Sequence, residues 1–134
     1  MCSIIGYSGN EIAAPIIVKG LKRMEYRGYD SVGVATESQN QIELKKGTGK
    51  VTEVNSKFQL DTLPGKIGIG HTRWATHGKV TDLNAHPHPS NSGKIAIVHN
   101  GIIENFEELK KQLEDDGYSF KSETDSEIIA NLLQ

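Results

Sequence analysis

The period of the hydrophobic residues changes along this chain, and that change limits which folds the chain can adopt. Residues 2–7 combine the strand formers Ile4, Ile5 and Tyr7 with a glycine, and the turn-like stretch SGN follows, which predicts a short strand. Over residues 11–26 the apolar residues instead recur at helical spacing, which predicts an amphipathic helix. The chain therefore has to accommodate strands and helices in one fold.

Two further segments have the pattern of β-hairpins. Strand-like runs at 31–36 and 41–47 are separated by a short polar turn, and KIAIVHNGIIEN reads as a strand, an Asn-Gly turn and a second strand. Segment 105–117 has a helical apolar face with Asn105 as its candidate cap, and a further helix begins near Ser126. The remaining expectations are a strand that ends at HTRWATHG and a strand with a turn in YSFKSETD.

Length and charge fit one ordinary globular domain. The chain has 134 residues, of which 36% are hydrophobic and 24% are charged, and its formal net charge is -2. Because both signs are scattered, bulk electrostatics give no reason to expect a nucleic-acid or membrane partner. No apolar stretch is long enough to span a membrane, and the N-terminus lacks the pattern of a signal peptide. We therefore expect a cytoplasmic protein.

The last predicted helix runs to the final residue without a glycine, proline or basic residue to close it. This pattern indicates a chain that stops inside a domain. Since the sequence has no internal repeat and no linker, residues 1–134 are interpreted as part of a single domain.

Cys2 is the only cysteine, so no internal disulfide can form. One interpretation is a small buried hydrophobic residue at the start of a strand. The other depends on position: removal of Met1 by methionine aminopeptidase would place the thiol and the α-amino group of the chain on one residue. The amine can then accept the thiol proton, which makes Cys2 a candidate nucleophile with its own base.

The stretch HTRWATHG gathers polar side chains at the end of a predicted strand. It is either a solvated loop with an incidental tryptophan or a substrate-binding loop. In the second case Arg73 would form a two-pronged contact with a carboxylate, and Trp74 would cover a small ligand and exclude water. The grouping suits a small anionic or zwitterionic ligand.

All five histidines lie between positions 71 and 99, which makes a metal site worth testing. However, the sequence has no HExxH helix and no ladder of cysteine and histidine ligands. Pro87 and Pro89 are expected to keep HPHP extended, with the rings of His86 and His88 on opposite sides. We therefore expect no metal ion and no other cofactor.

Two other motifs have both a structural and a chemical interpretation. Asn100 and Gly101 form either a hairpin turn or an oxyanion hole, in which the side-chain amide and a backbone N–H point at one spot. In SETDSE, either Thr124 and Glu127 form a helix-capping box, or Asp125 pairs with a substrate ammonium group. KGTGKV lacks the residues of a phosphate-binding loop.

Taken together, these stretches resemble the class II glutamine amidotransferases. The similarity rests on MCSIIGY, MEYRGYDS, HTRWATHG, NAHPH, HNGIIEN and SETDSE, which occur in this order along nearly the whole chain. RWATHG and SETDSE are similar to the hexosamine branch, in which a glutaminase domain supplies ammonia to convert fructose 6-phosphate to glucosamine 6-phosphate. Sister enzymes of purine, asparagine and glutamate synthesis share the leading cysteine and the Asn-Gly pair. Such a sister enzyme, or a non-catalytic glutamine-binding fragment, is the alternative.

The resemblance implies an α+β fold of the N-terminal nucleophile hydrolase type. This fold is an αββα sandwich of two mainly antiparallel sheets, truncated here at its C-terminus. Cys2 would attack the side-chain amide of glutamine and form a thioester, and Asn100 and Gly101 would form the oxyanion hole.

The same resemblance implies how glutamine would be held and which partners the domain would have. Arg73 would bind the α-carboxylate and Asp125 the α-ammonium group. Thr76 and His77 would line the pocket, with Trp74 in its mobile cover. The full-length chain would add a sugar-phosphate isomerase module, of which no part is in this sequence, and would form a homodimer.

Two features depart from the family pattern. The family has glycine after the nucleophile, whereas this chain has Ser3, whose side chain is expected close to the reacting thiol. Met1 is also part of the sequence, and while it is attached the nitrogen of Cys2 belongs to a peptide bond. The nucleophile is therefore expected to work only after Met1 has been removed.

Overall fold

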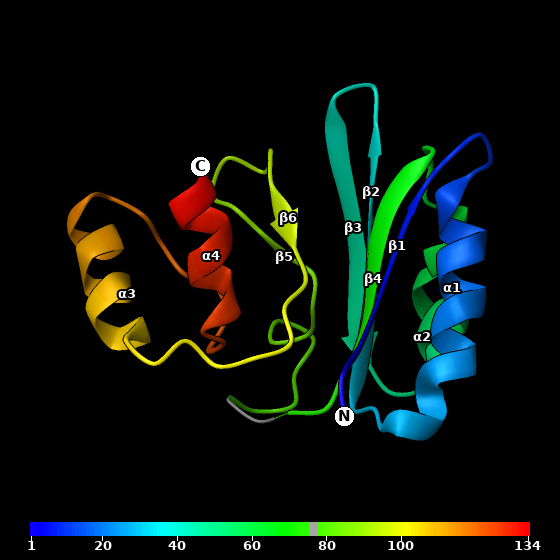
Figure 1. Ribbon diagram of the computed structural model, residues 1–134, viewed down its shortest axis with the longest axis horizontal. Helices are drawn as coiled ribbons and strands as arrows, with labels where there is room; N and C mark the ends of the chain where they lie inside the picture. Colours follow the sequence, from blue (N-terminus) through cyan, green and yellow to red (C-terminus); the bar gives the residue numbers. More distant parts are fainter. Residues whose placement is uncertain (76–77) are drawn as a thin grey trace.

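The computed structural model describes residues 1–75 and 78–134. Its main sheet has four antiparallel strands in the order β1-β4-β2-β3 (Figure 1). These strands are β1 (Ser3–Ser8), β4 (Ile67–Arg73), β2 (Ser31–Ser38) and β3 (Gln41–Thr48). A second antiparallel sheet pairs β5 (His88–Pro89) with β6 (Ala96–Ile97). The fold is mixed α+β with antiparallel sheets, which confirms that part of the prediction.

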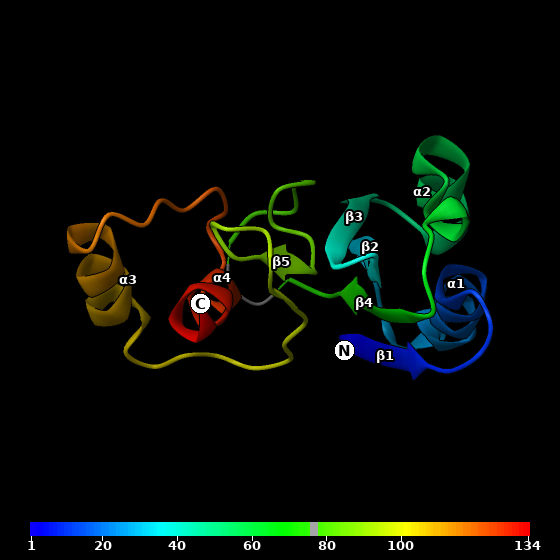
Figure 2. The same ribbon diagram turned by 90° about the horizontal axis from the view of Figure 1, so that it is seen from above.

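Helices α1 (Ala13–Met24) and α2 (Val51–Phe58) cover one face of the four-stranded sheet, as Figures 1 and 2 show. Every second side chain of a strand points toward these helices and contributes to the apolar core. The buried core residues are Ala13, Ala14, Ile17, Val18, Leu21, Val32, Val34, Val51, Val54, Leu60 and Leu63. Close packing here depends on glycine, because a Cβ on Gly70 would lie 2.4 Å from Ile17 Cγ2.

The second half of the chain lies on the opposite face of the four-stranded sheet (Figure 1). β5 and β6 lie nearest to that face, and α4 (Ser126–Leu133) packs on these two strands. α3 (Phe106–Asp115) lies farther out, beside α4. The layers therefore run from two helices through a large sheet and a small sheet to two further helices.

Most of the predicted elements are present. The first predicted hairpin is β2 and β3, and Gln39 and Asn40 form its turn with φ angles of 53° and 62°. The helix predicted over 11–26 is α1 followed by a short 3₁₀ helix, Glu25–Arg27. A second 3₁₀ helix, Leu60–Thr62, follows α2. No helix in the described part of the chain is long and apolar enough to cross a membrane.

The second predicted hairpin is wrong. β6 leads toward Asn100 and Gly101, but the residues that follow Gly101 form no strand. The backbone N–H of Ile103 donates to Asp125 Oδ2 at 2.6 Å, so a carboxylate takes the place of the strand partner that a hairpin would need. The chain leaves the sheet at this point and continues to α3.

The strand predicted in YSFKSETD and the capping-box interpretation of SETDSE are wrong for a related reason. The backbone N–H groups of Lys121 and Ser122 donate to the carboxylate of Glu127 at 3.0 and 2.8 Å. Thr124 Oγ1 lies 2.8 Å from His88 Nε2. Both side chains of the supposed capping box are therefore bonded elsewhere.

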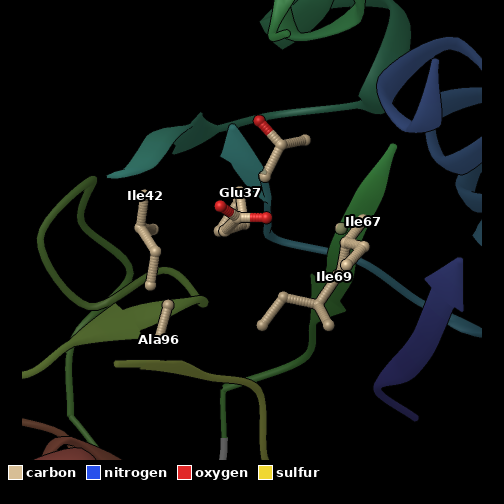
Figure 3. A pocket seen from close by; sticks show the side chains of 8 residues that line it. Glu37, Ile42, Ile67, Ile69 and Ala96 are labelled. Carbon is tan, nitrogen blue, oxygen red and sulfur yellow. The ribbon is translucent and has the colours of Figure 1, made fainter. Parts of the chain in front are cut away.

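A cavity of about 130 Å³ lies between the start of β4 and β6 (Figure 3). Its wall is mainly aliphatic, with Ile42, Ile67, Ile69 and Ala96 among the side chains that point into it. Glu37 is the one ionisable residue in this lining. The cavity offers little chemistry, and we interpret it as a packing gap between the two sheets.

Candidate active site

Three strand ends meet at one corner of the four-stranded sheet. Because β1 and β4 are antiparallel, the start of β1 lies beside the end of β4. The backbone N–H of Trp74 donates to Cys2 Sγ at 3.1 Å. β2 begins at the same corner, where the N–H of Asp30 donates to Arg73 O at 2.6 Å. The sheet thus brings the N-terminal thiol next to the HTRWATHG stretch.

The side chains of Cys2 and Ser3 point to opposite faces of the sheet, because side chains alternate along a strand. Ser3 is buried on the same face as Ile5, which packs against the core under α1. Its hydroxyl has no hydrogen-bond partner among the described residues. On this alternation the Ser3 hydroxyl points away from the thiol, toward the core under α1.

Met1 is attached to Cys2 in this structure. Its terminal ammonium group donates to Arg27 O at 2.6 Å, which holds the chain end against the 3₁₀ helix that follows α1. The nitrogen of Cys2 is then an amide nitrogen, which is not a base. A basic amine on Cys2 therefore requires the loss of Met1.

The loop after β6 brings Asn100 and Gly101 to the same corner. Asn100 Nδ2 donates to the backbone oxygen of Cys2 at 3.2 Å, and Asn100 Oδ1 lies 2.7 Å from His71 Nε2. Gly101 lies against the ring of His99, since an added Cβ would be 2.8 Å from Nε2. Both predicted oxyanion donors are thus next to the candidate nucleophile.

Arg73 and Asp125 contribute opposite charges to the wall of the site. Each is only 3% exposed. Arg73 Nη1 donates to Lys79 O at 3.0 Å, and Asp125 accepts a hydrogen bond from Ile103 N. Because both side chains also line the cavity beside Cys2, a ligand there would meet one positive and one negative group.

The thiol lies between a small polar cavity and an open apolar hollow. The polar cavity has a volume of about 30 Å³, room for no more than about two water molecules. It is lined by Cys2, Arg73, Trp74, His86, His99, Asn100, Gly101, Thr124, Asp125 and Ser126. The hollow has a volume of about 270 Å³. It is lined by Met1, Cys2, Trp74, Asn100, Gly101 and Ile102.

Trp74 is 53% exposed and lies over one side of the corner. Gly28, with a φ of +115°, lies close to its ring, since an added Cβ would be 3.2 Å from Trp74 Cε3. An aromatic ring in this position is able to cover a ligand bound beside Cys2. Thr76 and His77, the other residues predicted to line the pocket, lie outside the described residues.

Three buried histidines pack together between β4 and α4. The rings of His71 and His86 stack with their centroids 4.2 Å apart, and the ring of His88 meets that of His86 edge-on at 4.5 Å. Burial lowers the pKa of His71 to about 4. Burial, followed by neighbouring charges, lowers the pKa of His86 and of His88 still further. All three rings are therefore neutral at physiological pH.

The expectation that His86 and His88 point to opposite sides is wrong. β5 begins only at His88, so His86 lies in a bend ahead of the strand and not in extended chain. Both rings consequently enter the same buried space. In residues 1–75 and 78–134, no three histidine, cysteine or acidic side chains are grouped as a metal-binding set.

Several contacts that shape the site were missed by the sequence interpretation. His99 Nδ1 lies 3.0 Å from Ser126 Oγ, which connects the Asn-Gly loop to α4. The N–H of Ala75 donates to Asp30 Oδ2, which connects the residues after β4 to the start of β2. The crowding of histidines was the only signal for the first contact, and spacing alone does not say which ring meets which partner. The second contact had no signal in the sequence.

Comparison with known proteins gives a consistent sequence match. A family profile described as a glutamine amidotransferase domain matches residues 58–134. The chain is 58% identical over 134 residues to a glutamine--fructose-6-phosphate aminotransferase (isomerizing) of Pyrococcus horikoshii, and 59% identical to the protein of the same name from Methanococcus maripaludis. Each match covers 100% of this chain but 22% of the relative, so the chain spans about a fifth of their length.

Two solved structures match in fold and in sequence. One is a glutamine phosphoribosylpyrophosphate amidotransferase from B. subtilis complexed with ADP and GMP, with a TM-score of 0.82 and 33% identity. The other is described as the allosteric regulatory enzyme of purine biosynthesis, with a TM-score of 0.83 and 34% identity. Each match covers 99% of this chain and 29% of the other chain.

Proposed function

Because this chain belongs to the glutamine amidotransferase family, we propose that it hydrolyses glutamine to glutamate and ammonia with Cys2 as the nucleophile. One observation carries the proposal. The Cys2 thiol, the Asn100 amide and the buried charges of Arg73 and Asp125 all line one small cavity. This hydrolysis needs a nucleophile, a donor to the oxyanion, and two charged groups that bind the α-carboxylate and α-ammonium groups of the substrate.

The reaction begins after Met1 has been removed, when the free α-amine of Cys2 accepts the thiol proton. The thiolate adds to the side-chain carbonyl carbon of glutamine. The α-ammonium group then returns the proton to the departing nitrogen, which leaves as ammonia while a γ-glutamyl thioester remains. Water, deprotonated by the same amine, hydrolyses the thioester to glutamate and restores the thiol.

Asn100 and Gly101 stabilise the negative oxygen that forms when the thiolate adds. The Asn100 amide has two N–H bonds, and only one of them is needed for the contact with the backbone oxygen of Cys2. The second N–H and the backbone N–H of Gly101 are then available as the two donors. One such donor is worth about 3 kcal/mol of transition-state stabilisation.

Arg73 and Asp125 bind the α-carboxylate and the α-ammonium group of glutamine. Their burial excludes water and strengthens both ion pairs. Trp74 covers the bound glutamine. The cavity of about 30 Å³ has no room for a whole amino acid, so glutamine binding must widen it.

The layered arrangement supports an αββα sandwich of the N-terminal nucleophile hydrolase type, with residues 1–134 as its N-terminal part. The names and identities of the relatives support fructose 6-phosphate as the acceptor of the ammonia. In this proposal a sugar-phosphate isomerase module of the full-length protein makes glucosamine 6-phosphate, and the full-length protein is a cytoplasmic homodimer. The two matching solved structures, which have other names, make a sister amidotransferase with a different acceptor the alternative.

Labelling with a glutamine-like electrophile tests the nucleophile and its base. Intact mass and glutamate release are measured on the full chain before and after treatment with 6-diazo-5-oxo-norleucine. We expect a chain without Met1, glutamate release, and one adduct that maps to Cys2. Cys2→Ala should give neither product. A variant with an uncleaved N-terminal tag keeps the thiol but blocks the amine, and it should not turn over.

A chain that has lost Met1 but neither hydrolyses glutamine nor reacts at Cys2 would contradict the proposal. The acceptor is tested separately by adding fructose 6-phosphate to the full-length protein and measuring glucosamine 6-phosphate. Glutamine hydrolysis without that product favours the sister enzymes. Glutamine binding without hydrolysis favours the non-catalytic alternative.

A further inference from the structure

The Asn100 amide can take two orientations that differ by half a turn, and only one of them presents its N–H groups to Cys2. One end of the amide lies 3.2 Å from the backbone oxygen of Cys2, and the other end lies 2.7 Å from His71 Nε2. A carbonyl oxygen can only accept a hydrogen bond, so Nδ2 must face Cys2 and Oδ1 must face His71. This orientation is satisfied only if His71 Nε2 carries a proton.

We propose that His71 is the positioning residue that holds Asn100 in its donor orientation, through a hydrogen bond from Nε2–H to Oδ1. The inference rests on the proposed function, because His71 acts through the oxyanion donor. His71 does not line the polar cavity or the apolar hollow beside Cys2, so it is not placed to touch the substrate. Its effect on catalysis is therefore indirect, and its contacts with residues of the site include the hydrogen bond to Asn100 and the stacking on His86.

The surroundings of His71 favour the tautomer with the proton on Nε2. The ring is fully buried, and its Nδ1 has no hydrogen-bond partner among the described residues. A proton on Nδ1 would be a buried donor without an acceptor, and Nε2 would then face Asn100 Oδ1 as one lone pair against another. Stacking on His86 at 4.2 Å also restricts the plane of the ring.

The ionisable groups around His71 keep the ring in one protonation state. Burial is the main cause that lowers its pKa to about 4, and the positive charge of Arg73 on β4 adds to this effect. The hydrogen bond to the Asn100 side chain acts in the opposite direction, as do the charge of Asp30 at the start of β2 and a hydrogen bond to the backbone of His99. The stacked His86 is itself neutral, and His99 precedes Asn100 on the facing loop. The Nε2–H donor is consequently present, on a neutral ring, throughout the physiological pH range.

Two substitutions at His71 separate donor loss from loss of packing. His71→Met removes the hydrogen-bond donor and fills the space of the ring with an apolar side chain of similar length. His71→Gln instead supplies a side-chain N–H near the position of Nε2. We expect His71→Met to lower kcat for glutamine hydrolysis about 10- to 100-fold, with KM changed less than about twofold. His71→Gln should recover at least about a third of that loss on a logarithmic scale.

His88→Met is the matched control, because His88 belongs to the same buried cluster but contacts Thr124 and not Asn100. Its kcat should stay within about threefold of the original value. Equal losses of kcat in His88→Met and His71→Met would mean that any damage to the cluster has this effect, and the proposal would be overturned.

A double-mutant cycle tests whether His71 acts through Asn100. In the Asn100→Ala background, His71→Met should change kcat by less than about twofold, because the donor that His71 positions is already gone. A loss in that background as large as in the original chain overturns the inference.

Nitrogen-15 NMR of the histidine side chains gives a test that requires no activity. In the full chain at pH 7 we expect His71 to be neutral with its proton on Nε2. A proton on Nδ1 overturns the inference even if the protein hydrolyses glutamine. If the proton is on Nε2 but the protein, freed of Met1, does not hydrolyse glutamine, the proposed function fails while the geometric inference stands.

Discussion

The two halves of the chain are stabilised in different ways. Residues 1–73 contain all four strands of the large antiparallel sheet. All residues of the buried apolar cluster lie between Ala13 and Leu63. In residues 78–134 each strand is only two residues long. The buried polar residues there are Asn84, His86, His88, Ser90, Thr124, Asp125, Ser126, Glu127 and Asn131.

In the second half, side chains make the hydrogen bonds that strand partners make in the first. Asn91 Oδ1 accepts from Ser119 N, and Asn91 Nδ2 donates to Ser119 O, both at 2.8 Å, much as two paired strand residues would. Asn84 Oδ1 accepts from Glu123 N in the same way at 2.8 Å. The comparison teaches that the ladder supplies a rigid support, while the polar network leaves loops free to present Asn100 and Asp125.

Lowering the pH is expected to have the largest effect on the free energy of unfolding, because it acts on the buried histidines between the two halves. In an unfolded chain a histidine titrates near pH 6.5, whereas burial lowers the folded-state pKa of His71 to about 4 and those of His86 and His88 further. Between pH 6.5 and 4 the unfolded state therefore binds more protons, and stability falls as the pH falls. Three such groups give a slope of up to about 4 kcal/mol per pH unit.

Denaturant unfolding of the full chain between pH 7.5 and 4.5 measures this slope. His88→Gln removes one of the three titrating groups, so its stability should fall less steeply, by up to about 1.4 kcal/mol per pH unit. Identical slopes for the two proteins would show that His88 does not remain neutral in the folded state.

Glu127→Ala is expected to have the next largest effect and to act on the second half alone. The substitution leaves the partly buried N–H groups of Lys121 and Ser122 without their acceptor, at a cost of about 1 to 2 kcal/mol in the free energy of unfolding. Hydrogen exchange should show lost protection at these two amides, with the β1–β4 ladder unchanged.

Glu114→Ala is the matched control for Glu127→Ala. Glu114 is exposed on α3 and forms a surface ion pair with Lys110 at 3.9 Å, so its loss should cost less than about 0.5 kcal/mol. If Glu127→Ala exposes the β1–β4 ladder to exchange as well, the two halves unfold together and the comparison has to be given up.

Ser3→Ala is expected to have the smallest effect, in the opposite direction. The Ser3 hydroxyl is buried in the first half without a hydrogen-bond partner among the described residues, so its removal should raise the free energy of unfolding by about 1 kcal/mol. Chemical denaturation compares it with Ser8→Ala, at the exposed end of β1, which should change little. A loss of stability in Ser3→Ala would mean that the hydroxyl does have a partner.

The same contrast explains how much could be predicted from the sequence. The β2–β3 hairpin and α1 were predicted because strand-forming runs around a polar turn and helical spacing are both local signals. The loop after Gly101 was assigned to a strand because its hydrogen-bond acceptor, Asp125, is 22 residues from Ile103 in the sequence. No local pattern carries that information.

The candidate site follows the same division. The chemistry and position of Cys2, Arg73, Asn100 and Asp125 made them candidates, and the structure gathers them around one cavity. The contact between His71 and Asn100 was not predicted, because a buried histidine in a strand looks the same in the sequence whether it packs or positions a neighbour.

The attachment of Met1 has a consequence for access as well as for chemistry. Cleavage after Met1 removes one wall of the apolar hollow beside Cys2 and the ammonium group that donates to Arg27 O. A single processing step would thus create the base, free the carbonyl of Arg27 and widen the approach to the thiol.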